Sequence, residues 1–182
     1  LGKTKAILEV GQYEEKIRIQ LKKLIAQKDR TQLQENGVLQ EAIKCGKNLA
    51  DDVQTAKQLL AKQEQAIAEA ESLASVRVKE KLDAFLLKYC DVLPAYDLQR
   101  IETEWRTRRR VEILTSMQKN LAAGDGENVA KLVATYYKRI EVGTFDKYDQ
   151  ELRACIDNGE KLIIDIKRAM NLLSEASNSN SK

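Results

Sequence analysis

Four arginines and the only tryptophan stand within the eight residues WRTRRRVE, at positions 105–112. Clustered guanidinium groups can bind phosphate or carboxylate. In a helix, however, successive side chains point about 100° apart, so the arginines at 108–110 cannot share one face. Glu102 and Glu104 each precede an arginine by four residues, in the order that favours ion pairs along a helix. We therefore interpret the cluster as a salt-bridged helix surface, with a partner, nucleic-acid or lipid contact as the alternatives.

A second basic surface lies nearer the N-terminus, in a 15-residue segment with six basic residues and one acid, a net charge of +5. Lys16, Lys23 and Arg30 recur every seven residues, so an unbroken helix would place them on one row, with Lys22 beside them. We favour a coiled-coil surface whose acidic partners lie on the next helix. The alternative is an anionic contact with a membrane, an acidic protein or nucleic acid.

Tyr137 and Arg139 form a third candidate contact. Tyrosine and arginine are enriched among the residues that dominate affinity at protein interfaces. The competing interpretation is structural, with one of the adjacent tyrosines Tyr136 and Tyr137 in the core and the other half-exposed.

Catalytic and metal-binding patterns are missing from the sequence. It contains no histidine, and its three cysteines, Cys45, Cys90 and Cys155, are far apart with no CxxC pair. Ordinary zinc sites and histidine acid–base catalysis are therefore not expected. The glycine-containing segments GDGEN and VGTF match neither a phosphate-binding loop nor a dinucleotide fingerprint. We predict no enzyme activity, cofactor, metal or small-molecule substrate.

The composition indicates a helical chain. Its 182 residues include only eight glycines and one proline, fewer than a turn-rich β fold needs. A net charge of +3 is too small to imply nucleic-acid binding by itself. No run of 18 apolar residues predicts a membrane span. Scattered cysteines on apolar helix faces are typical of reduced core residues, so we expect a cytoplasmic or otherwise intracellular, reducing compartment.

Apolar periodicity predicts six helices. They cover residues 3–35, 38–74, 76–92, 96–123, 127–142 and 144–173. The second has a seven-residue repeat, which favours a left-handed supercoil. The repeat runs through Leu39, Gly46, Val53, Leu60, Ile67 and Ala74. We expect the chain to reverse at Asn36-Gly37 and form an antiparallel coiled-coil hairpin; one long dimerising helix is the alternative.

The fourth predicted helix changes its apolar direction across the arginine cluster. Three apolar residues before the cluster point one way, and three after it point another. These are Leu98, Ile101 and Trp105, and then Leu114, Met117 and Leu121. Either this helix kinks, or its two halves pack against different neighbours.

The sixth predicted helix keeps its apolar stripe in phase over 29 residues, from Phe145 to Leu173. We therefore place the turn-like sequence DNG, residues 157–159, inside the helix. Gly159 falls on the buried face, where a second helix can approach closely. Thr144 is the predicted N-cap.

The sequence as a whole predicts an all-α protein. We expect an elongated N-terminal coiled-coil hairpin at 1–75, a bundle of three to four helices at 76–174 and a disordered tail at 175–182. The predicted function is a non-enzymatic interaction or scaffold module that binds another protein or self-associates, for example as a homodimer. The alternative is a peripheral membrane-binding or membrane-shaping helical dimer that uses the basic first helix, and nucleic-acid binding is the least favoured partner class.

Overall fold

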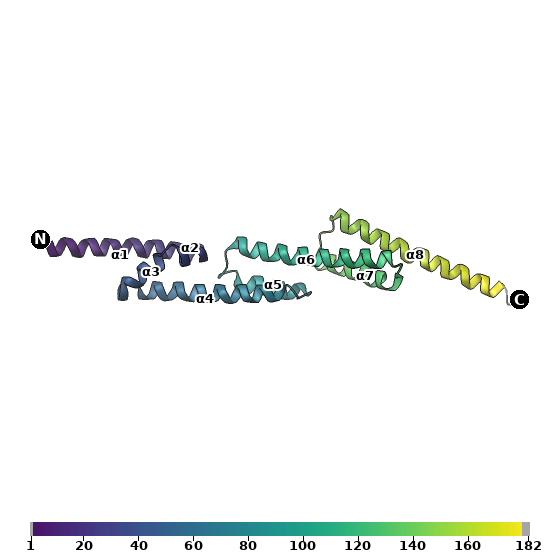
Figure 1. The fold of residues 1–182 in the computed structure, drawn as a ribbon, viewed down its shortest axis with the longest axis horizontal. Coiled ribbons are helices and arrows are strands. Elements are labelled where there is room, and N and C mark those ends of the chain that lie inside the picture. Colours follow the sequence, from purple (N-terminus) through teal and green to yellow (C-terminus); the bar gives the residue numbers. More distant parts are fainter. Residues whose placement is uncertain (1, 180–182) are drawn as a thin grey trace. The chain divides into compact units, whose positions relative to one another are not determined.

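The computed structural model describes residues 2–179, and this part of the chain is helical with no strand (Figure 1). The all-α prediction is confirmed. No helix in this range is long and apolar enough to cross a membrane. The helices are α1 (Gly2–Gln27), α2 (Arg30–Glu35), α3 (Val38–Lys44), the 3-10 turn η1 (Gly46–Leu49), α4 (Ala50–Leu73), α5 (Lys79–Tyr89), α6 (Ala95–Ala122), α7 (Gly126–Glu141) and α8 (Gln150–Ser179).

The chain divides into two compact units, Leu1–Ile101 and Glu102–Lys182. The division falls inside α6, later than the expected boundary after residue 75, because α5 and the start of α6 belong to the first unit. The two ends of α6 thus have different neighbours, which explains why its apolar direction changes along the sequence.

The first predicted helix, 3–35, is broken, and that prediction was wrong in its extent. The backbone amides of Lys28 and Asp29 bond back to carbonyls in the last turn of α1, a pattern that ends helices. Lys28 has a φ of 56°, a left-handed conformation that is uncommon for a residue other than glycine. The Asp29 carboxylate then accepts a hydrogen bond from the Gln32 amide at 3.0 Å and caps α2. Arg30 therefore starts a new helix.

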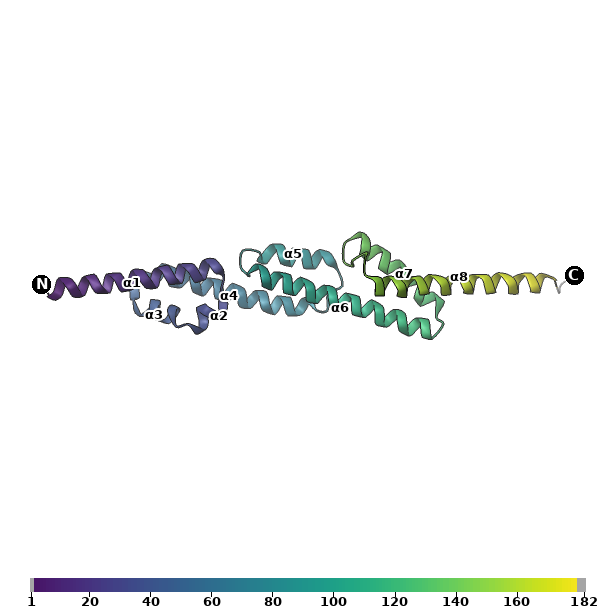
Figure 2. The ribbon, with the colours of Figure 1, turned by 90° about the horizontal axis from the view of Figure 1, so that it is seen from above.

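The second predicted helix, 38–74, is also broken, at Gly46. This glycine has a φ of 70° and starts η1, so a predicted seam position is a turn instead. The short α3 returns along α1, and α4 then runs in the same direction as α1 (Figures 1 and 2). Residues 2–73 are not one long helix, and the two-limbed coiled-coil hairpin is not confirmed.

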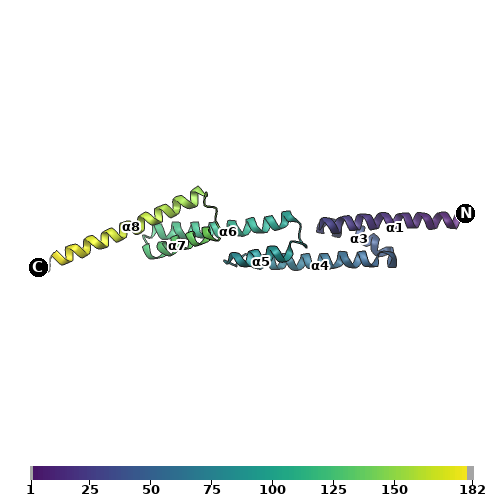
Figure 3. The same ribbon diagram turned by 180° about the vertical axis from the view of Figure 1, so that it is seen from behind.

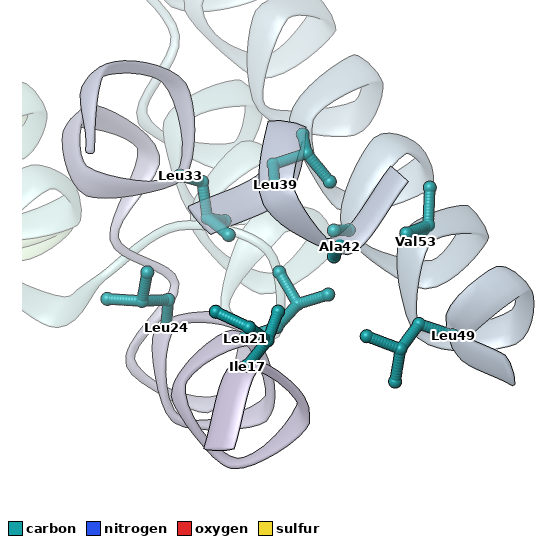
Figure 4. Close-up of a cluster of buried hydrophobic side chains, with 9 residues drawn as sticks. Ile17, Leu21, Leu24, Leu33, Leu39, Ala42, Leu49 and Val53 are labelled. Atoms are coloured by element: carbon teal, nitrogen blue, oxygen red, sulfur yellow. The ribbon is translucent and has the colours of Figure 1, made fainter. Parts of the chain in front are cut away.

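The core of the first unit lies where α1, α2, α3, η1 and α4 meet. Aliphatic side chains from these elements converge there (Figure 4). They are Ile17, Leu21, Leu24, Leu33, Leu39, Ala42, Leu49, Val53 and Ala56. Each large aliphatic side chain buried in this way contributes about 1.5–3 kcal/mol. The two alanines are fully buried and leave room for the short α3 against its neighbours.

One polar side chain, Gln63 on α4, is fully buried in the same unit. Its amide nitrogen donates to the carbonyl oxygens of Lys28, at 2.8 Å, and Val92, at 3.1 Å. The Lys28 ammonium in turn donates to the Cys90 carbonyl oxygen at 2.7 Å. The two hydrogen bonds of Gln63 therefore connect the turn after α1 and the turn after α5 to the middle of α4.

The second unit contains the rest of α6, with α7 and α8. Its core is formed by Ile113, Leu114, Met117, Val129, Val133, Tyr136, Phe145, Leu152 and Ile156. Residues 157–159 lie inside α8, as predicted, and Gly159 is buried. A Cβ at Gly159 would lie 3.0 Å from Val129 Cγ1 and 3.3 Å from Met117 Sδ, which confirms the expected close approach of neighbouring helices.

The start of the last helix was predicted wrongly, because α8 begins at Gln150 and not at 144. Gly143, with a φ of 68°, ends α7 in a left-handed turn, and Thr144 is buried instead of capping a helix. The cap is Asp149, whose carboxylate accepts a hydrogen bond from the Leu152 amide at 3.0 Å.

The other end of α8 continues to Ser179, so residues 175–179 are helical where a disordered tail was expected. The remaining tail residues, 180–182, lie outside the part of the chain that the structure describes.

The three cysteines carry free thiols. Cys45 and Cys155 are partly buried, and burial raises the pKa of the Cys155 thiol. Cys90 is exposed after the end of α5, so the expectation that all three are core residues was wrong for this one.

Candidate interaction surfaces

The predicted basic row is reduced to two residues. Lys16 and Lys23 are both exposed on α1 and make no ion pair within the described part of the chain. Ile19 stands between them with 60% of its side chain exposed, so this face of α1 combines two positive charges with an apolar group. Arg30 is half-buried at the start of α2, and the break at Lys28 removes it from the row.

Lys22 lies on a different side of α1 and has an acidic neighbour. Its ammonium is 3.7 Å from Oδ1 of Asp52, and Arg18 Nε is 3.5 Å from Oδ2 of the same carboxylate. Asp52 belongs to the first turn of α4. The expected neutralisation of the first helix by acids on the second therefore occurs at Arg18 and Lys22, and not at Lys16 and Lys23.

Tyr137 and Arg139 both contact other residues of the second unit. Tyr137 is 46% exposed, and its hydroxyl donates to Glu160 Oε1 on α8 at 3.0 Å, which raises the pKa of the phenol. The neighbouring Tyr136 is buried, as the structural interpretation expected. The Arg139 guanidinium lies 5.8 Å from the centre of the Phe145 ring. These contacts stabilise the unit and leave a half-exposed tyrosine at its surface.

Arg106 binds the segment between α7 and α8. Its guanidinium donates to the carbonyl oxygens of Gly143 and, at 3.1 Å, Thr144. It also donates to the Glu102 carboxylate at 2.8 Å, which is the ion pair expected from the four-residue spacing. Arg106 therefore holds the end of α7 against α6.

Arg110, one turn further along α6, binds the start of α8. It donates to both carboxylate oxygens of Asp149 and to Glu151 Oε2, the last at 2.5 Å. These acids raise the pKa of the guanidinium, and its hydrogen bonds hold the pKa of Asp149 below the ordinary value of a carboxyl. Arg110 thus binds Asp149, the capping residue of α8, and holds the start of that helix against α6.

Arg109 is only 7% exposed, so the solvated-surface interpretation was wrong for this residue. Its guanidinium is 3.0 Å from Glu112 Oε2 and lies 6.0 Å from the centre of the Trp105 ring. Arg108, by contrast, is exposed. Three of the four arginines, Arg106, Arg109 and Arg110, therefore bind other residues of the second unit and stabilise it.

The Arg110–Asp149 pair predicts a loss of stability in acid. A carboxyl whose pKa is lowered in the native state stabilises that state above its unfolded pKa, here ordinarily 3.8, and stops doing so as the pH falls through the native value. Asp149→Asn keeps a capping side chain but removes the charge. Above about pH 5 we expect Asp149→Asn to lower the free energy of unfolding by up to about 1 kcal/mol. Urea unfolding followed by circular dichroism should show the difference shrinking below about pH 4, and a difference independent of pH would contradict the assignment.

A further surface is the α8 seam, a row of apolar positions spaced alternately by four and three residues. It comprises Leu152, Ile156, Gly159, Ile163, Ile166, Met170 and Leu173. Its first three positions are buried, and Ile163 and Ile166 are partly buried. Met170 and Leu173, by contrast, are 64% and 71% exposed. The seam therefore continues in register beyond the core that covers its beginning.

The cover ends because α7 is shorter than α8. The two helices have 16 and 30 residues, and α7 begins at Gly126, beside the Ile166 side chain. The end of α8 extends past α6 and α7 (Figure 3). The sequence located the apolar stripe but not its exposure. The signal that could have indicated this exposure is the length of the stripe, which exceeds the length of the predicted helix at 127–142.

The N-terminal part of α1 has a similar exposed region in the first unit. Leu8, Val10 and Tyr13 are between 49% and 64% exposed, whereas Ile17 and Leu21 on the same helix are buried. Each unit thus contains a long helix with apolar side chains beyond its own core.

The fold and these surfaces define an all-α chain of two helical units with exposed apolar helix faces. No family model, curated protein or solved structure matches it. Its function is therefore argued from the surfaces themselves.

Proposed function

We propose that this chain is a non-enzymatic helical interaction module that binds another protein, or a second copy of itself, through exposed apolar helix faces. The observation that carries this proposal is the exposed end of the α8 seam. Contiguous exposed apolar groups on a soluble helix mark interaction sites, because covering each large side chain is favourable by about 1.5–3 kcal/mol.

The spacing of the seam also indicates the kind of partner. Apolar positions alternating by three and four residues form the interface of coiled coils, where each side chain inserts between four residues of a facing helix. Met170 and Leu173 offer such positions to a partner helix that is itself amphipathic. Arg168 and Glu175, two charged residues of the same segment, are exposed on the side of α8 opposite the seam and keep the uncovered helix hydrated.

Binding experiments with seam variants test this function. The variant Met170→Glu/Leu173→Glu should lose self-association and the binding of any purified protein partner, because it places charge in the interface. Ile164→Glu is the matched control, since Ile164 is 64% exposed on the far side of α8. Affinity capture followed by mass spectrometry supplies candidates, each to be retested as a purified protein. Native chain and double variant behaving alike in every assay would contradict the proposal.

The second candidate function is peripheral membrane binding, and the face of α1 formed by Lys16, Ile19 and Lys23 favours it. A basic residue near an anionic bilayer contributes about 1 kcal/mol, so two lysines give weak attraction that salt screens. We expect co-sedimentation with phosphatidylserine vesicles at about 50 mM salt to fall by at least half at about 500 mM salt.

Charge reversal tests the same candidate. Lys16→Glu/Lys23→Glu should abolish vesicle binding, whereas Lys57→Glu/Lys62→Glu, which changes the net charge equally on exposed sites of α4, should largely retain it. Equal losses in the two variants, or binding insensitive to salt, would contradict a membrane contact through this face of α1.

A further inference from the structure

We propose that two copies of this chain pair antiparallel through the exposed end of the α8 seam, at residues 166–177. This inference rests on the proposed function and names a second copy as the occupant of the surface. The seam's alternating spacing extends from Leu173 to Ser177, so the pairing segment holds four consecutive positions, the first of which, Ile166, is partly buried against α7. These are Ile166, Met170, Leu173 and Ser177.

The seam is complementary to itself in the antiparallel orientation. With a two-fold axis crossing between residues 171 and 172, Met170 of each copy faces Leu173 of the other. Ile166 likewise faces Ser177 of the other copy. A two-fold axis makes the same patch serve on both copies, which is the commonest symmetry of homo-oligomers.

The positions beside the seam suit the same register. Ala169 faces Ala176 of the other copy on one side, and two small side chains there let the helices approach closely. On the opposite side Lys167 faces Ser174 of the other copy. No like charges are therefore brought together along the interface, where their repulsion would weaken the pair.

The cover of the seam by α7 favours the antiparallel orientation over the parallel one. The seam up to Ile166 is occupied by neighbouring helices, with Gly126 of α7 beside Ile166 and Val129 beside Gly159. A parallel partner helix would need that same space in both copies. In the antiparallel pair, the uncovered positions Met170 and Leu173 of the two copies meet, and residue 177 of each copy reaches the level of Ile166, where α7 of the other begins.

The length of the overlap sets the strength of the pair. Twelve helical residues span about 18 Å, and the buried surface stays below about 1,200 Å², in the class of weak, transient contacts. We therefore expect a dissociation constant on the order of 100 μM.

Sedimentation velocity of the full chain between about 5 and about 500 μM tests the pairing. The native chain should move from the monomer value toward the dimer value. Met170→Glu and Leu173→Glu should each raise the dissociation constant at least about tenfold, because a charge enters the interface. Ile164→Glu should leave it unchanged. Circular dichroism should show equal helix content in all four proteins.

A native chain that stays monomeric at every concentration, or association that persists in both seam variants, would overturn the pairing. A monomeric native chain whose binding to a purified partner is lost in Met170→Glu would overturn the pairing while leaving the proposed function standing. If the seam variants lose neither self-association nor binding to a purified partner, both the pairing and the proposed function are overturned.

Cross-linking tests the orientation, in a chain whose native cysteines are replaced by serine. A mixture of Ala169→Cys and Ala176→Cys chains should form the mixed disulfide, because these positions face each other only in the antiparallel register. Efficient cross-linking of Met170→Cys with itself, without the mixed product, would indicate a parallel pair and overturn the proposal.

Discussion

Replacing Gln63 with alanine is expected to lower the free energy of unfolding by about 2–4 kcal/mol. The side chain is fully buried, so truncation leaves a cavity among α4 and its neighbours. It also removes the donor that serves the carbonyl oxygens of Lys28 and Val92, two half-buried residues, and a carbonyl that is left without a partner keeps the desolvation cost of its burial. Urea unfolding monitored by circular dichroism measures the loss.

Two further variants separate the causes of the Gln63 effect. Gln63→Leu fills the cavity but supplies no donor, so it should recover only the packing part of the loss. Gln65→Ala, on the exposed side of α4, should change stability by less than about 0.5 kcal/mol. Hydrogen exchange should accelerate in the turns after α1 and α5 in both Gln63 variants. Equal effects of alanine at 63 and 65 would rule out the role assigned to Gln63.

Gln63 illustrates what the sequence could and could not predict. Gln63 lies on a second seven-residue row of the predicted helix 38–74, which fills the positions between those of the first row and includes Leu49 and Ala56, and the structure buries it there. Its partners are backbone carbonyls 35 and 29 residues away. They are available only because helices end at those points, one of them at Lys28, whose side chain carries no strong turn signal. Local periodicity predicts which face is buried, whereas the turn at Lys28 is also held by the hydrogen bond from Gln63, 35 residues away.

At the arginine cluster, too, the sequence predicts the contacts within one helix but not those with residues far away in the chain. Spacing rules describe pairs within one helix, and the Glu102–Arg106 pair follows them. The contacts that decide the role of the cluster join Arg106 and Arg110 to residues about 40 positions later, between α7 and α8. The basic row failed for a related reason, because a single break at Lys28 separates Arg30 from Lys16 and Lys23.

Replacing Gly159 with leucine is expected to lower the free energy of unfolding by about 2–3 kcal/mol. A Cβ at this position would already lie 3.0 Å from Val129 Cγ1 and 3.3 Å from Met117 Sδ and Val133 Cγ2. A leucine must therefore displace α6 and α7 from α8. Thermal and urea unfolding of the purified chain measure the effect.

Alanine at position 159 distinguishes steric conflict from helix propensity. Alanine favours a helix over glycine by about 1 kcal/mol, which opposes the tight contacts of its single methyl group, so Gly159→Ala should change stability little. Asn158→Leu adds a similar side chain on the exposed side of α8 and should also be nearly neutral. A loss in Asn158→Leu as large as in Gly159→Leu would mean that the chain tolerates no bulk at this level of α8. The contrast expected instead shows that the chain's own helices α6 and α7 fill the space beside the seam at Gly159.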